Sequence, residues 1–199
     1  MSDDARPTWR SLEALLEHLR RTGAFEPSPE DDTPLARMTR EFFCNNWVAA
    51  RDGLLAKTDK IRVYQEASPA PRCFRFEMAV PYKCKHGDGP VQIAAGPVRG
   101  EIRYHPQIFE CEPGTPSVAV SLDDDLGYFH ANYSRRYQLL CLGDLPSGPF
   151  PLDALLEHLY SILSYANWRS FHPADTEAAY YFATDPTALE GVGNPQPLY

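Results

Sequence analysis

The chain has 199 residues, of which 43% are hydrophobic and 23% are charged, proportions typical of a globular protein with one proper core. Its 27 acidic residues outnumber 19 basic ones and give a net charge of -8, which argues against nucleic acid as the main partner because phosphate binding needs a concentrated positive field. No apolar stretch is long enough to span a bilayer, and the start of the chain lacks the apolar segment of a signal peptide. We therefore expect a cytoplasmic protein without a membrane partner.

The first 32 residues predict an amphipathic helix and a linker. The apolar face of this helix is made of leucines at the i, i+3, i+4, i+7 spacing: Leu12, Leu15, Leu16 and Leu19. Gly23 is its expected stop, and the polar, proline-bearing residues 26–34 follow as a linker. Residues 1–32 are thus assigned to an N-terminal helix and linker.

A second helix is predicted from about Pro34 to Leu54. Thr33 is a suitable N-cap, and proline is favoured in a first helical turn. The expected apolar positions of this helix are Leu35, Met38, Phe42, Phe43, Trp47 and Val48.

Between Lys60 and about Leu122 the pattern changes to short, alternating segments rich in β-branched and aromatic residues. The expected strands are residues 61–64, 73–78, 92–94, 101–104 and 117–120. Turn-forming clusters separate them at short spacing, which favours an antiparallel meander over a parallel sheet with crossover helices.

The remainder of the chain predicts a loop-rich stretch and then further helices. The loop-rich stretch is expected at 123–151, and helices at 152–163 and at about 175–183. The fold class is therefore α+β, with one domain over residues 33–185 and a C-terminal tail at 186–199.

Cys141 lies in a loop between an extended segment and a helix, nine residues past Asn132 in the run His130-Ala131-Asn132. A reachable thiol with a side-chain amide upstream to stabilise an oxyanion is typical of a thioester-forming nucleophile. The alternative for a cysteine flanked by leucines is a buried core position. For Asn132, the alternative to an oxyanion-stabilising role is that of an ordinary turn residue.

The five cysteines, an odd number at irregular spacing, indicate free thiols rather than a disulfide framework. One group of residues offers possible metal ligands: Cys73, Cys84, His86 and Cys111. The Cys-x10-Cys-x-His spacing within this group matches no tight zinc site. We expect neither a metal nor another cofactor.

The order of elements and several motifs resemble those of ubiquitin-conjugating enzymes. The run 130–132 is similar to that family's His-Pro-Asn tripeptide, and Cys141-Leu142 is similar to the cysteine dipeptide that follows it. Phe150-Pro151 stands where the family's Trp-x-Pro would end, and residues 116–120 resemble its Pro-x-Val-x-Phe. The resemblance covers roughly residues 33–185.

The chain also departs from the pattern of this family. Ala131 replaces the proline of the tripeptide, Gln138 replaces a glycine before the cysteine, and Phe150 replaces the tryptophan. The chain looks like a divergent bacterial member, of the kind that works beside a ubiquitin-like protein, an activating enzyme and a peptidase in antiphage defence operons.

The resemblance implies the fold of ubiquitin-conjugating enzymes (a UBC-like fold), which is a four-stranded antiparallel meander flanked by helices. It also implies a conjugating activity. Cys141 would accept the C-terminus of a ubiquitin-like protein as a thioester from an activating enzyme and pass it to an amine on a protein target. Asn132 would stabilise the oxyanion or hold the cysteine loop, and His130 would bond nearby backbone rather than act as a base. The acidic gate residue stays open among Asp175, Ser170 and His172.

Three arginines of the second helix, Arg37, Arg40 and Arg51, are candidates for docking the activating enzyme, with a solvated helix face as the equal alternative. Two other functions compete with conjugation. One is a non-catalytic adaptor of the same fold that binds a ubiquitin-like protein. The other is a cysteine peptidase that pairs Cys141 with His158 or His172.

Overall fold

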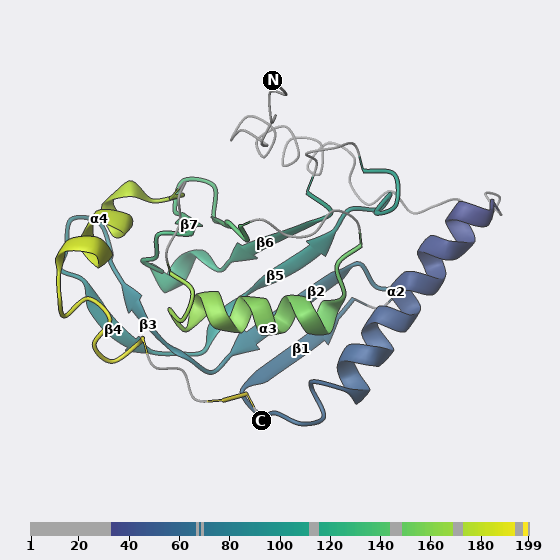
Figure 1. Cartoon of the computed structure of the whole chain (residues 1–199), viewed down its shortest axis with the longest axis horizontal. Coiled ribbons are helices and arrows are strands. Elements are labelled where there is room, and N and C mark those ends of the chain that lie inside the picture. The colour runs from purple at the N-terminus through teal and green to yellow at the C-terminus, as the bar shows by residue number, and fades with distance from the viewer. Residues whose placement is uncertain are drawn as a thin grey trace, which may run out of the picture.

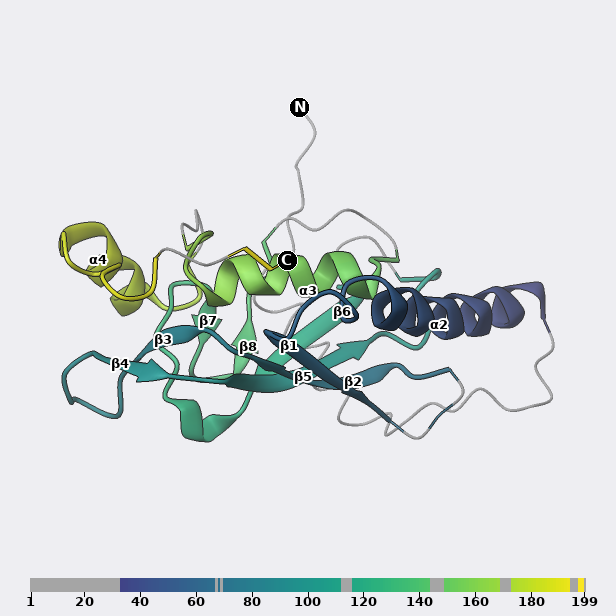
Figure 2. The same cartoon turned by 90° about the horizontal axis from the view of Figure 1, so that it is seen from below.

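An antiparallel sheet carries two long helices on one of its faces (Figures 1 and 2). The computed structural model describes residues 33–66, 68, 70–111, 116–143, 149–168, 173–193 and 197–198. The helix and linker predicted for residues 1–32 lie outside these ranges. The α+β class expected from the sequence is confirmed.

Helix α2 spans Pro34–Asp52 and begins where the sequence predicts. The Thr33 hydroxyl accepts a hydrogen bond from the Ala36 amide at 3.1 Å, which satisfies one of the free donors of the first turn. Phe43 is buried against the sheet, whereas Met38 and Val48 are each 44% exposed. The expected apolar face is thus wrong for these two residues, which lie on the solvent side of α2.

The main sheet has six strands in the order β1-β2-β5-β6-β8-β7, and every neighbouring pair is antiparallel. The strands are β1 Ile61–Gln65, β2 Cys73–Met78, β5 Val98–Tyr104, β6 Val118–Leu122, β7 Tyr133–Ser134 and β8 Leu139–Leu140. The antiparallel meander is confirmed, but the sheet is wider than the four strands expected. The two extra strands have only two residues each, too few to leave an alternating pattern in the sequence.

A separate two-stranded ladder, β3 Pro81–Cys84 with β4 Gln92–Ala95, is inserted between β2 and β5. The strand predicted at 92–94 belongs to this ladder and not to the main sheet. The ladder is tied to the rest of the fold because Cys84 forms an isolated bridge with Tyr128, just after the 3₁₀ helix η1 (Asp124–Leu126).

Alternation along the strands determines which face of the sheet is buried. On β2, Phe74, Phe76 and Met78 are at most 1% exposed and share one face of the sheet, where the Phe74 ring stacks on Trp47 of α2. Arg75, between them, lies on the opposite face, where it pairs with Asp123 at 2.9 Å. The core therefore lies between the sheet and the helices.

Helix α3 (Leu152–Leu163) lies across the sheet, and α4 (Thr176–Thr184) lies at the end of the structure far from α2 (Figures 1 and 2). The start of α3 is anchored to the core by two hydrogen bonds. The Asn46 side-chain oxygen accepts from the Leu152 amide at 2.6 Å, and the Tyr104 hydroxyl donates to the Phe150 carbonyl at 2.9 Å.

The segment expected as a C-terminal tail includes residues 186–193, which form turns in which Ala188 and Val192 are buried. Within the part of the chain that the structure describes, no helix combines the length and the apolarity needed to cross a membrane.

Asn46→Ala is expected to lower the free energy of unfolding by about 1–3 kcal/mol, because the buried Leu152 amide would lose its acceptor. Urea denaturation gives this value. Asn45→Ala is the matched control, since Asn45 is exposed one position earlier on the same helix, and it should leave the stability nearly unchanged. Equal effects of the two substitutions would contradict the anchoring role of Asn46.

Candidate functional site

Cys141 and Asn132 are brought together by the short hairpin that β7 and β8 form. Tyr133 pairs with Leu140, and Ser134 pairs with Leu139 next to the turn of the hairpin. The Cys141 amide then donates to the Asn132 carbonyl at 2.6 Å. The cysteine is therefore held directly opposite the last residue of the run 130–132.

The chain leaves the sheet at Cys141. Leu139 and Leu140 are each 5% exposed, whereas Cys141 is partly exposed and forms no disulfide. Gly143, two residues later, is exposed and has a φ of +71°, a conformation that glycine adopts without steric cost. A partner can thus reach the backbone on the far side of the cysteine.

Three of the other described cysteines are poorer candidates for a nucleophile. Burial raises the pKa of Cys73 and of Cys111, which favours the unreactive thiol form. Cys84 is buried in the core. Across the described ranges, no group of three or more His, Cys, Asp or Glu side chains is arranged to hold a metal ion.

His158 on α3 holds the loop that follows the cysteine. Its Nε2 lies 2.8 Å from the Leu142 carbonyl, and because a carbonyl only accepts, this nitrogen carries the hydrogen. The sequence analysis named His158 as a possible base of a cysteine peptidase. In the structure, its Nε2 donates to a backbone carbonyl instead. With the bond from Cys141 to Asn132, the loop is fixed on both sides of the thiol.

His130 is fully buried beneath the same hairpin. Its Nδ1 accepts a hydrogen bond from the Asn132 amide at 2.9 Å, so the hydrogen of the neutral ring is on Nε2. The ring stacks on Tyr128 at 5.7 Å and lies 4.7 Å from the Tyr165 ring. This backbone contact agrees with the role expected for His130.

Burial lowers the pKa of His130 to about 3, and the nearby Ile162 carbonyl only partly opposes this effect. Nε2 is buried and forms no hydrogen bond of good geometry with any described residue. The imidazole is therefore neutral at physiological pH. It acts as an acceptor for one backbone amide and not as a proton carrier.

Asn132 is only 6% exposed, and its side-chain oxygen is buried without a hydrogen-bond partner among the described residues. Leaving such an atom unpaired costs about 1–3 kcal/mol, so the presence of an asparagine side chain at this buried position calls for an explanation. The backbone of Asn132 is fully used, with its amide bound to His130 and its carbonyl to Cys141. The unpaired side-chain oxygen thus belongs to the residue opposite the cysteine.

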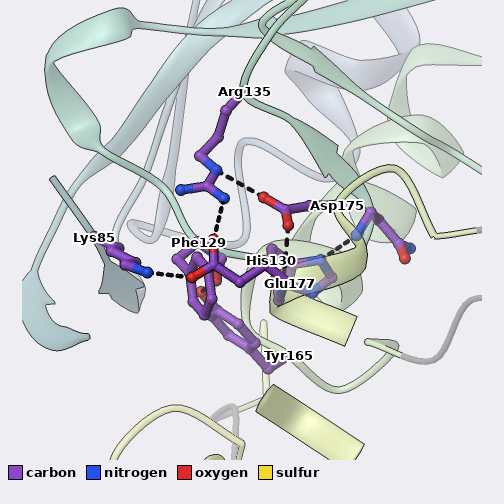
Figure 3. A network of polar contacts seen from close by, with 9 residues as sticks. Lys85, Phe129, His130, Arg135, Tyr165, Asp175 and Glu177 are labelled. Atoms are coloured by element: carbon purple, nitrogen blue, oxygen red, sulfur yellow. Dashed lines mark hydrogen bonds and ion pairs between the residues drawn. The ribbon is translucent and has the colours of Figure 1, made fainter. Parts of the chain in front are cut away.

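Asp175 joins the start of α4 to the tripeptide. The amides of Ala174 and Asp175 donate to the Ala131 carbonyl at 2.8 and 3.2 Å. One carboxylate oxygen of Asp175 accepts from the Ala178 amide at 3.0 Å, and the other accepts from Arg135 at 2.7 Å (Figure 3). Both oxygens are thus occupied in this state.

The other two candidates for the acidic gate, Ser170 and His172, lie outside the described residues. Which residue serves as the gate stays a prediction.

A network of charges extends from Asp175 across the outer side of the hairpin (Figure 3). Arg135 also binds Glu177 at 2.7 Å, and the other carboxylate oxygen of Glu177 pairs with Lys85. The Phe129 ring lies 5.4 Å from the Arg135 guanidinium and 5.9 Å from the Lys85 amine. Hydrogen bonds from Lys85 and then Arg135 lower the pKa of Glu177.

This network was missed by sequence reasoning. The one local signal was acidic residues at positions 175 and 177, where a helix start favours negative charge.

Tyr165 was also missed. Its hydroxyl donates to the Phe129 carbonyl at 2.8 Å and accepts from the Lys83 amide at 3.0 Å, so it joins β3 to the segment before the tripeptide. Its φ of +61° is uncommon for a residue with a side chain. No sequence pattern marks such a position.

The arginines proposed for docking lie on α2, at the opposite end of the structure from α4 (Figures 1 and 2). Arg37 is exposed, Arg40 is half-buried, and Arg51 pairs with Asp52 at 2.7 Å. Their use by a partner stays a prediction.

The chain matches no known family model and no curated protein. The function is therefore proposed from the geometry described above together with the motifs of the sequence.

Acid is expected to destabilise the protein through His130. Its pKa is about 3 when folded and roughly 6.5 when unfolded, so between these values the unfolded chain binds a proton that the folded chain does not. Stability should then fall by about 1.4 kcal/mol per pH unit as the pH drops through this window.

Urea denaturation between pH 4 and 7 measures this slope. His130→Gln should reduce the slope of the free energy of unfolding against pH, whatever its effect on overall stability. The control is His86→Gln, because His86 is exposed in a loop and should leave the slope in place. A slope that persists in His130→Gln would contradict the assignment.

His158→Leu should loosen the loop after Cys141, because the Leu142 carbonyl would lose its donor. A hydrogen bond worth about 0.5–1.5 kcal/mol corresponds to roughly 2- to 10-fold faster hydrogen exchange at the neighbouring Cys141 amide, which donates to the Asn132 carbonyl. His158→Gln keeps an N–H donor and should retain most of the protection. Unchanged exchange in His158→Leu would show that the contact does not restrain the loop.

Proposed function

We propose that this protein is a conjugating enzyme for a ubiquitin-like protein, with a UBC-like fold and Cys141 as the thioester carrier. The observation that carries the proposal is the hydrogen bond between the Cys141 amide and the Asn132 carbonyl. Through this bond the backbone of Cys141, a partly exposed residue, lies opposite the asparagine of a His-Ala-Asn run, at the edge of an antiparallel sheet. These are the features that the family resemblance requires at its site.

In the first step, the Cys141 thiolate attacks the thioester that links the modifier to its activating enzyme. One C–S bond forms, another breaks, and the activating enzyme's thiolate leaves. The exchange is nearly thermoneutral, so the protein needs to supply only access and alignment. The partial exposure of Cys141 supports the access, and the bonds from Asn132 and His158 to the loop support the alignment.

In the second step, an amine of the target attacks the new thioester, and a tetrahedral oxyanion forms. The Asn132 side-chain amide is the proposed donor to this oxyanion, a type of contact whose removal costs other enzymes about 3–4 kcal/mol. The C–N bond forms in this attack, and collapse of the intermediate then breaks the C–S bond and releases the Cys141 thiolate, while the proton of the amine passes to water.

Other residues hold this site in place or recruit partners. His130 fixes the Asn132 backbone as a neutral acceptor. Asp175 is the proposed gate; in this state Arg135 holds its carboxylate, so it would have to leave Arg135 before it could contact an incoming amine. Arg37, Arg40 and Arg51 are the proposed docking residues for the activating enzyme.

One observation favours a second candidate, an adaptor of the same fold. Asn132 is 6% exposed, and a side chain so buried fits a loop-holding residue as well as an oxyanion donor. An adaptor would bind the ubiquitin-like protein without forming a thioester. A partly exposed cysteine that continues the hairpin favours the carrier.

The proposal predicts that Cys141 accepts an acyl group from a small thioester. The full chain would be incubated with acetyl-Gly-Gly thioester of 2-mercaptoethanesulfonate and measured by intact mass. We expect one acyl group, reversed by dithiothreitol and lost in Cys141→Ala. Cys44→Ala and Cys111→Ala are matched controls and should retain it, since neither cysteine belongs to the hairpin.

Two outcomes would contradict the proposal. Acylation of Cys141 no faster than that of Cys44 and Cys111 would favour the adaptor. Accumulation of free acetyl-Gly-Gly in excess over the protein would instead favour a hydrolase.

A further inference from the structure

Strand β1 forms one edge of the main sheet, and the β7-β8 hairpin that leads to Cys141 forms the opposite edge (Figure 1). One side of β1 is paired with β2, from Ile61 opposite Met78 to Gln65 opposite Phe74. Its other side has no strand beside it among the described residues. A free edge of this kind is able to pair with a strand of another chain.

The hydrogen bonds to β2 show which backbone groups of β1 remain for such a partner. The Ala79 amide donates to the Lys60 carbonyl at 2.8 Å, and the Glu66 amide donates to the Cys73 carbonyl at 3.2 Å. Because alternate residues of an antiparallel strand bond the same neighbour, the even-numbered residues of β1 bond β2. Three residues therefore turn their amides and carbonyls outward: Ile61, Val63 and Gln65. These groups bond no other backbone group of the described residues.

The outward groups of β1 match those of a second copy that runs in the opposite direction. With Val63 of one copy opposite Val63 of the other, Ile61 lies opposite Gln65 on both sides of this central pair. Each outward amide then meets an outward carbonyl. The arrangement is two-fold symmetric, so the same surface serves both copies.

The side chains are complementary at this register. Arg62 of one copy lies opposite Tyr64 of the other, and both are exposed, Tyr64 by 53%; a guanidinium over a tyrosine ring is a favourable contact. At each end of the strand, Lys60 lies opposite Glu66, which pairs opposite charges. β1 has no proline and pairs with β2 without a bulge, so it lacks two of the features that protect an edge strand.

Lys60 and Glu66 each have capacity for this additional pair. The Lys60 amine has three hydrogens and donates to the Pro197 carbonyl. Glu66 accepts from the Arg72 amide at 2.7 Å through Oε1. Its second carboxylate oxygen forms no hydrogen bond with another described residue and is left to face an amine.

We propose that this protein forms a symmetric dimer in which the β1 strands of two copies pair antiparallel, centred on Val63. The two main sheets then continue into one another. The edge that leads to Cys141 stays uncovered in each copy, because it lies on the opposite side of the sheet from β1. The dimer does not depend on the proposed function.

Sedimentation equilibrium of the full chain over a concentration series at low salt tests this proposal. We expect the mass to rise from one chain to two. Val63→Pro should raise the Kd of the dimer by about tenfold or more, because each copy loses an outward amide at the centre of the pair. The fold should be retained, since this amide does not bond β2 and proline is tolerated on an edge strand.

Charge reversal provides a second test of the register. Lys60→Glu and Glu66→Lys should each raise the Kd by roughly threefold or more, because like charges then face each other at both ends. The double variant should restore the original Kd. Lys57→Glu is the matched control, since Lys57 is exposed in the turn before β1, and it should leave the Kd unchanged.

Three outcomes would overturn the dimer. A mass of one chain at every concentration excludes self-association. A dimer with an unchanged Kd in Val63→Pro uses another surface. Single charge reversals that the double variant does not correct exclude the register centred on Val63.

Discussion

The backbone of residues 130–132 is the point on which the site depends, because it is hydrogen-bonded to elements on each side. The Ala131 carbonyl receives two amides from the segment before α4, and the Asn132 carbonyl receives the amide of Cys141. Beneath them, His130 accepts from the Asn132 amide. Three peptide units thus hold the cysteine, the start of α4 and the buried aromatic core in one arrangement.

A neutral histidine is well suited to this place. A charged imidazole could not accept from the Asn132 amide, and burying a charge among Tyr128 and Tyr165 would cost several kcal/mol. The low pKa of His130 is therefore a consequence of the same packing that positions Asn132. Tyr165 extends that packing to β3 through its hydroxyl, so the inserted β3-β4 ladder also supports the site.

The elements that were predicted well are those in which local chemistry and packing agree. Thr33 before Pro34 marks a helix start, and the leucines of α3 repeat at the spacing of one buried face, so both helices begin where expected. The proximity of Asn132 and Cys141 followed from motif spacing. These features depend on residues close together in the chain.

The parts that were not predicted depend on contacts between distant segments. Arg135 binds the carboxylate of Asp175, which is 40 residues away in the chain, and the Tyr165 hydroxyl binds the Lys83 amide, which is 82 residues away. Strands of two residues have no period to detect, so β7 and β8 were described only as loop. Met38 and Val48 were assigned to a buried face of α2 because hydrophobic identity alone does not show which side of a helix packs against the sheet.

The contacts on the two sides of the hairpin respond differently to the salt concentration of the solution. The inner side rests on aromatic packing around His130, which dissolved ions scarcely affect. The outer side rests on ion pairs of Arg135 and Lys85 with the exposed carboxylate of Glu177, and salt screens such charges over about 8–10 Å. A rise in ionic strength would therefore weaken the contacts on the outer side of the hairpin while the packing around His130 is kept.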